Sequence, residues 1–192
     1  MKAWIECLFL AFAPVFLIGC AWVPQKVTIA PQVQAPTSSI GNGATVVVRV
    51  VDSRPSLRIG YRGLDSKGAE ITTAQDLAPI FQQKIIEGLS QQGFKAVAAS
   101  EGPARLLNVE IRVLEYTAEL DFWKGTIRAK AAIQAFTKLD GFTFDQLYVA
   151  ERNESGSEAP AAKKNAQLIN RVISDVLQRL LGDRKLVQML AD

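Results

Sequence analysis

Residues 107–151 read LNVEIRVLEYTAELDFWKGTIRAKAAIQAFTKLDGFTFDQLYVAE, and the alternation of apolar and polar side chains in this stretch decides the fold. Apolar residues occupy odd positions over 107–113 and even positions over 114–120, which predicts one long strand with a β-bulge at the switch. Alternation resumes over 127–135, and Asp140-Gly141 is a strong signal for a tight turn between antiparallel strands. The stretch therefore predicts three long antiparallel strands in succession.

Two segments with helical periodicity flank these strands. Asp76 is a suitable N-cap for a helix that carries one apolar face and ends before Gly93. A second helix, from about Ala162 to Leu181, has an apolar stripe wide enough to pack on a sheet.

The β-branched run Thr45–Asp52 adds a strand before the first helix, and residues 57–72 add a hairpin-like excursion. The expected order is β-β-α-β-β-β-β-α. We expect a single α+β domain over residues 44–192, in which two amphipathic helices cover one face of a mostly antiparallel sheet of about five or six strands.

Composition excludes several kinds of function. The chain has 192 residues, 22 Lys and Arg against 19 Asp and Glu, two Cys and no His. The net charge of +3 is too small to predict a nucleic-acid partner. Without histidine there is no Ser-His-Asp or Cys-His catalysis and no His-ligated zinc. We therefore expect no metal, no cofactor and no enzymatic activity.

The N-terminus resembles a bacterial lipoprotein signal. Lys2 is followed by an apolar run over 3–18, which is short for a membrane span, and the run ends in Leu17-Ile18-Gly19-Cys20. This tetrapeptide resembles the lipobox, which implies removal of residues 1–19 by cleavage between Gly19 and Cys20. The resemblance also implies that Cys20 carries diacylglycerol and a further acyl chain such as palmitate, which together give stable anchoring. Ala21 directly follows the cysteine. A residue other than Asp at this position resembles the signal of lipoproteins that continue to the outer membrane.

Residues 20–43 are expected to form the acylated cysteine and a flexible tether, because Pro24, Pro31 and Pro36 interrupt any regular structure. The predicted location is the cell envelope, on the inner leaflet of the outer membrane and facing the periplasm.

Further motifs resemble one family. The stretch Val50-Val51-Asp52-Ser53-Arg54-Pro55, the Ile59-Gly60 step and the helix opening Asp76-Leu77, together with the signal, resemble the YajG family of bacterial lipoproteins over about residues 1–190. The resemblance implies the fold and the location. It supplies no catalytic residues.

Two pairs of residues are candidate partner-binding groups. Asp52 and Arg54 either contact a charged ligand at a strand end or stabilise a local turn. Phe122 and Trp123 lie near a predicted hairpin tip, where they either anchor a partner or fold back on the sheet.

Other charged residues leave alternatives open. Glu115 and Glu119 share one face of the long strand, which suits either a carboxylate-only hydrolase or a solvated face. Basic residues of the closing helical region either are simply solvated or contact anionic headgroups or cell-wall polymers: Lys163, Lys164, Arg171, Arg179, Arg184 and Lys185.

Taken together, the sequence predicts a lipid-anchored, non-catalytic protein that binds another envelope protein. The alternative is a module that binds an envelope polymer or lipid, such as peptidoglycan or lipopolysaccharide. The partner and the oligomeric state do not follow from the sequence.

Overall fold

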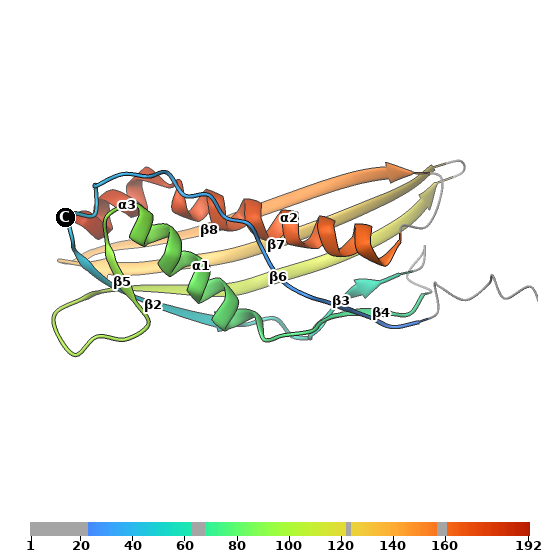
Figure 1. Cartoon of the computed structure of the whole chain (residues 1–192), viewed down its shortest axis with the longest axis horizontal. Helices are drawn as coiled ribbons and strands as arrows, with labels where there is room; N and C mark the ends of the chain where they lie inside the picture. The colour runs from blue at the N-terminus through green and yellow to red at the C-terminus, as the bar shows by residue number, and fades with distance from the viewer. Residues whose placement is uncertain (1–22, 63–67, 122–123, 157–160) are drawn as a thin grey trace, which may run out of the picture.

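The computed structural model describes residues 23–62, 68–121, 124–156 and 161–192, which form an α+β fold with eight strands in one sheet and three helices (Figure 1). The sheet is built on β6 (Arg105–Asp121), β7 (Lys124–Leu139) and β8 (Phe142–Gly156), which pair antiparallel in chain order. This confirms the three long strands that the sequence predicts. Strands of this length span about 50 Å, so the domain is elongated along them.

Local sequence explains how these strands bend and turn. The register of β6 against β7 shifts between Ile111 and Val113, which is where the apolar alternation predicts a bulge. Asp140 and Gly141 both have positive φ, 48° and 83°, as the tightest hairpin turns require.

Short strands share the other edge of β6. The first half of β6 pairs in parallel with β2 (Thr45–Asp52), which also pairs with β5 (Lys95–Val97). The second half meets β3 (Arg58–Tyr61), followed by β4 (Glu70–Thr73) and β1 (Gln25–Val27). Glycine is needed where β3 meets β6, because a Cβ on Gly60 would lie 1.9 Å from the carbonyl oxygen of Tyr116.

The predicted sheet was therefore wrong in two respects. Four of the seven strand pairings are parallel, so the sheet is mixed and not mostly antiparallel, and it has eight described strands instead of five or six. The described order is β-β-β-β-α-β-β-β-β-α-α. Alternation within a strand carries no information on the direction of its neighbour, and strands of three or four residues are too short to show a clear period.

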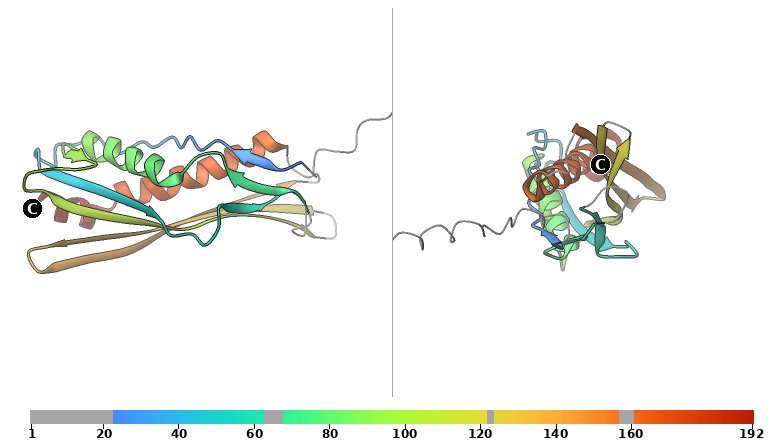
Figure 2. Two further views of the ribbon diagram at one scale, coloured as in Figure 1. Left: turned by 90° about the horizontal axis from the view of Figure 1, so that it is seen from below. Right: turned by 90° about the vertical axis from the view of Figure 1, so that its right-hand side faces the viewer.

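Helices α1 (Leu77–Gln91) and α2 (Ala162–Leu181) lie on the same face of the sheet, as predicted (Figure 2). A short α3 (Arg184–Ala191) follows. The Asp76 carboxylate accepts a hydrogen bond from the Ala78 N–H at 3.2 Å and caps α1. The two long helices approach closely, since a Cβ on Gly88 would lie 2.3 Å from a methyl carbon of Leu181. Eight apolar residues of α2 are buried in the core: Leu168, Ile169, Val172, Ile173, Val176, Leu177, Leu180 and Leu181.

The segment predicted as a tether is mostly part of the domain. After β1, residues 28–43 run across the helices to the opposite end of the molecule, and we call them the strap (Figure 1). The Ala30 N–H donates to Asn170 Oδ1 at 2.7 Å and the Gln32 N–H to Ser174 Oγ at 2.9 Å, both on α2. These α2 side chains bind backbone groups on either side of Pro31, so the strap is held to the domain at Ala30 and Gln32, unlike the flexible tether predicted over 20–43.

None of the described helices combines the length and the hydropathy needed to span a bilayer.

Candidate functional site: the open face of the sheet

The two faces of the sheet differ in what covers them. In β7 the residues at odd positions over 127–137 are buried beneath the helices, while most of those at even positions point away from them. The described helices α1 and α2 lie on the first face only, which leaves the second face to solvent (Figure 2). We call these the covered face and the open face.

Backbone register gathers side chains from four strands on the open face. One cross-strand row consists of Arg49, Asn108, Phe136 and Asp145, and the next consists of Val51, Glu110, Gln134 and Leu147. Residues directly opposite each other have Cβ atoms about 5 Å apart, and adjacent rows are within reach of long side chains. We call these eight residues the open-face patch.

Large apolar side chains in this patch are exposed to solvent. Val51 is 56% exposed, Leu147 47% and Phe136 39%. A hollow of about 310 Å³ lies over the rows, and Arg112 on its rim pairs with Glu110 at 2.7 Å. Apolar side chains surrounded by charges of both signs are the usual composition of a protein-binding surface.

Strand β8 continues the patch to the border of the sheet. It pairs only with β7, so within the described residues its other edge has no strand beside it. Two carbonyl groups on that edge accept side-chain hydrogen bonds, Leu147 O from Gln146 and Val149 O from Arg179. Phe142, at the start of the strand, is 75% exposed. An unpaired edge next to exposed apolar side chains is a place where an extended partner segment can add to a sheet.

A second hollow, of about 620 Å³, lies between β8 and α2 and is mainly polar. Its Arg152 pairs with Asp175 at 2.5 Å, and its Arg179 donates to the Val149 carbonyl. Glu151 and Glu154 also line it, and its lining contains no aromatic residue. A polymer-binding groove with free cations and stacking rings is therefore not assembled at this place.

Asp52 and Arg54 bind each other. The Arg54 side chain is only 3% exposed and donates from Nη2 to Asp52 Oδ2 at 2.8 Å and from Nε to Oδ1 at 2.9 Å. Burial alone would raise the pKa of Asp52, but these hydrogen bonds and the guanidinium charge outweigh it and hold the pKa below its usual range. The geometry matches the turn-stabilising alternative, because the guanidinium is turned away from solvent.

The remaining predicted site residues are dispersed or lie outside the described part. Gly19, Cys20, Phe122 and Trp123 fall outside the described residues. Glu115 and Glu119 are exposed on the open face, where Glu115 lies opposite Lys130. Within the described ranges, acidic and thiol side chains nowhere gather in threes as a metal centre would require.

A buried polar network joins β1, β6 and α2 on the covered face. Tyr116 donates its hydroxyl hydrogen to Asn165 Oδ1 at 2.8 Å, and Asn165 donates to Gln25 Oε1 at 3.2 Å. Gln25 in turn donates to the Ala162 carbonyl at 2.7 Å. Burial raises the pKa of Tyr116 far above its usual value, so the phenol stays a donor. The network fixes the place where the chain enters the domain.

Sequence reasoning missed the open-face patch. Phe136 stands at an even position in a strand whose odd positions form the predicted core, and Leu147 likewise falls out of phase with Tyr148 and Ala150. The sequence signal that could have revealed the patch is a large apolar residue at a position where the alternation predicts an exposed polar one. Its neighbours in space become visible only with the register of four strands.

These features define the class: a small α+β domain with one covered and one open sheet face. The chain belongs to the YajG family of lipoproteins, because the family model described as "uncharacterized lipoprotein" matches residues 31–191.

Several solved structures are similar to this chain at low identity. An uncharacterized protein shares 11% identity, with 82% of this chain and 97% of that chain covered and a TM-score of 0.48. The hypothetical protein CT253 from Chlamydia trachomatis shares 14%, with 76% and 94% covered and a TM-score of 0.36. Lipoprotein GNA1162 from Neisseria meningitidis shares 16%, with 72% and 97% covered and a TM-score of 0.26. No curated protein sequence matches significantly.

Proposed function

We propose that this protein is a lipid-anchored, non-catalytic component of the bacterial envelope that binds another envelope protein through its open-face patch. Acylated Cys20 holds it on the inner leaflet of the outer membrane, facing the periplasm. Membership of a lipoprotein family supports the anchor, as does the LIGC signal at residues 17–20.

One observation carries the binding role. Val51, Phe136 and Leu147, three exposed apolar side chains from β2, β7 and β8, occupy two adjacent rows of one uncovered surface. Isolated exposed apolar residues are ordinary, but a group of them beside a sheet edge that has no neighbouring strand among the described residues favours a protein partner. Because both signs of charge surround them, the patch suits a mixed protein surface better than a uniformly anionic polymer.

Photocrosslinking in living cells tests the binding role. A photoreactive residue is placed at Leu147, and the matched control carries it at Gln83, which is exposed on α1 in the helix layer. The proposal predicts a discrete protein adduct from position 147 that is absent from position 83. Adducts with glycan or lipid alone would contradict it and favour the polymer-binding alternative.

Anchoring is tested separately with Cys20→Ser. Without the thiol no lipid can be attached, so the variant should be soluble or remain unprocessed when cell fractions are compared with those of the unaltered protein. A variant that is still cleaved and still held in the membrane fraction would contradict anchoring at Cys20.

A further inference from the structure

One end of the elongated domain lies close to any lipid attached at Cys20. We call the end at which the described chain begins with Val23 the proximal end, and the end with the β7–β8 turn the distal end (Figure 1). The domain holds the chain from Gln25 onward, through the Gln25 bond to the Ala162 carbonyl and the bonds of the strap to α2. Five peptide units separate Cys20 from Gln25, which limits the distance to about 17 Å.

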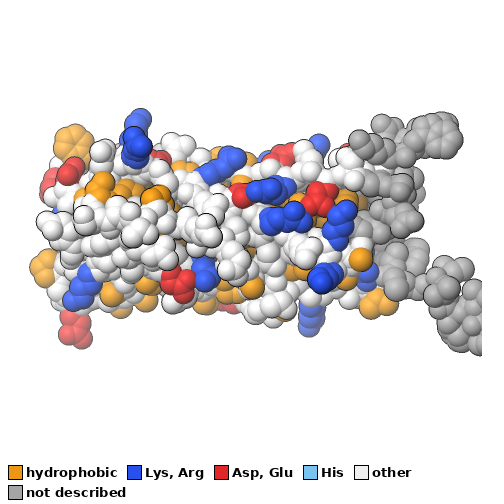
Figure 3. Space-filling model, turned by 45° about the horizontal axis from the view of Figure 1, so that its top comes forward, with side chains coloured by type: hydrophobic (Ala, Val, Ile, Leu, Met, Phe, Trp, Pro, Cys, Tyr) orange, Lys and Arg blue, Asp and Glu red, His pale blue; other side chains and the backbone are white. Residues whose placement is uncertain are grey.

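Basic side chains gather around this point of entry. Lys26 is exposed on β1, next to Gln25, which donates to the Ala162 carbonyl in the first turn of α2. Lys163 and Lys164 belong to the same turn of α2. Arg171 lies two turns further along α2. We call these four residues the proximal basic face. Figure 3 shows Lys and Arg side chains gathered mainly on the right-hand half of the visible surface, with Asp and Glu side chains among them.

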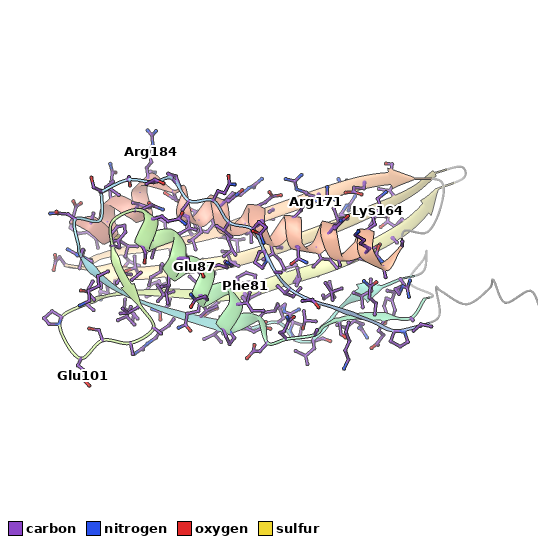
Figure 4. The ribbon with its side chains drawn as sticks, in the orientation of Figure 1. Phe81, Glu87, Glu101, Lys164, Arg171 and Arg184 are labelled. Atoms are coloured by element: carbon purple, nitrogen blue, oxygen red, sulfur yellow. The ribbon has the colours of Figure 1, made fainter. Side chains whose placement is uncertain are left out.

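Acidic side chains form ion pairs with only part of these charges. Lys164 and Arg171 share a single carboxylate, Glu154, at 3.5 Å and 3.0 Å. Within the described residues, Lys26 and Lys163 take part in no ion pair. Figure 4 shows Lys164 near the proximal end and Arg184 at the other end of the helical layer. Charges of both signs occur at both ends: Glu70 and Glu119 lie at the proximal end, and the distal end has Glu101, Asp140 and Asp192 with Lys138, Arg184 and Lys185.

From this placement we infer that the proximal basic face rests on the headgroups of anionic phospholipids in the leaflet that holds the anchor. The inference builds on the proposed anchoring at Cys20. Attraction to an anionic leaflet acts within a Debye length of about 10 Å and strengthens binding about fivefold for each Lys or Arg near the surface. A link of at most about 17 Å allows Lys26 and Lys163 to come within that range of the leaflet, while the distal end extends roughly 50 Å away.

Vesicle binding by the unlipidated chain tests this contact apart from the proposed function. The protein is residues 20–192 with Cys20→Ser, which keeps every described core residue, since the first of them is Val27. The probes are phosphatidylcholine vesicles with 30% phosphatidylglycerol and vesicles of phosphatidylcholine alone. The measurement involves neither lipidation nor a protein partner. A negative result would therefore contradict the lipid contact alone, and not the proposed anchoring at Cys20 or the proposed binding through the open-face patch.

Two triple variants lower the net charge equally. Lys26→Gln, Lys163→Gln and Lys164→Gln neutralise the proximal face, and Lys138→Gln, Arg184→Gln and Lys185→Gln neutralise the distal end. We expect the unaltered chain to sediment with anionic vesicles at least tenfold more strongly than with neutral ones. We further expect binding to anionic vesicles to fall at least tenfold in the proximal variant and less than twofold in the distal variant.

Equal losses of binding from the two triple variants would overturn the inference, and so would no preference for anionic vesicles in the unaltered chain. Raising the salt to 0.5 M supplies a check on the unaltered protein, because contact through exposed charges must weaken as they are screened. Binding that does not change with salt would also overturn it.

Discussion

The covered and open faces of one sheet have the same backbone but different roles. Ile133 and Ala135 on β7 are fully buried beneath the helices, while Gln134 and Phe136 between them face outward. Apolar residues on the covered face supply the hydrophobic stabilisation of the fold, since they leave water on folding. Apolar residues on the open face remain about half exposed and therefore contribute less. In the proposed function, Phe136, Val51 and Leu147 on the open face serve to bind a partner.

Two leucines provide the largest contrast. Leu177 on α2 is fully buried against the sheet, and Leu147 on the open face is 47% exposed. Leu177→Ala should lower the free energy of unfolding by about 3 kcal/mol, because it leaves a cavity, whereas Leu147→Ala should cost about 1 kcal/mol or less. Urea denaturation of both variants measures the difference. Equal losses would mean that the open face is also part of the core.

Two ion pairs extend the comparison from apolar to charged groups. Arg54 is buried with Asp52, while Arg128 and Glu151 form an exposed pair on the open face, with side chains 49% and 40% exposed. Asp52→Asn leaves the guanidinium without its carboxylate and should cost about 2 kcal/mol, less than a fully buried pair because Asp52 is 18% exposed. Glu151→Gln should change the unfolding free energy by no more than about 0.5 kcal/mol. Similar losses of unfolding free energy in the two variants would mean that the buried ion pair contributes no more to stability than the exposed one.

The buried pair also predicts a pH dependence. Because the folded protein holds the pKa of Asp52 below its usual value of about 3.9, the pair stabilises the fold above that value and the stabilisation is lost as the pH falls through the lowered pKa. The difference in unfolding free energy between the unaltered protein and Asp52→Asn should therefore be largest at pH 6 and shrink toward about pH 2. Urea unfolding of both proteins across this range measures it. A gap that stays constant would show that Asp52 does not act through its charge.

A smaller effect is expected from the polar network at the proximal end. Tyr116→Phe removes the donor to Asn165, leaves a buried acceptor without a partner, and should cost about 1.5 kcal/mol. The control is Thr117→Val on the open face of the same strand, which should change the unfolding free energy by about 0.5 kcal/mol or less. If the two substitutions had the same effect, the network would not be what holds β1 to α2.

Much of the covered face was predictable from the sequence, and little of the open face was. The alternation over 107–135 predicts the long strands and their bulge, and Asp76 and Gly93 predict the bounds of α1, because these signals are local. The parallel pairing of β2 with β6 depends on contacts about sixty residues apart, which alternation does not encode. The same holds for the open-face patch, since Val51 and Phe136 line one hollow only through that pairing. The strap was mistaken for a tether because its hydrogen bonds are made by α2 side chains distant in sequence, such as Asn170.

The most direct test of the account measures binding and stability on one double variant. Phe136→Thr with Leu147→Thr removes the apolar side chains and keeps residues that favour strands. A photoreactive residue at Val51, across the patch, reports partner contact in cells, and urea unfolding reports stability. The account predicts that the protein adduct is lost while the unfolding free energy changes by about 1 kcal/mol or less. An undiminished adduct, or a variant that no longer folds, would contradict the claim that the open face binds and the covered face holds the fold.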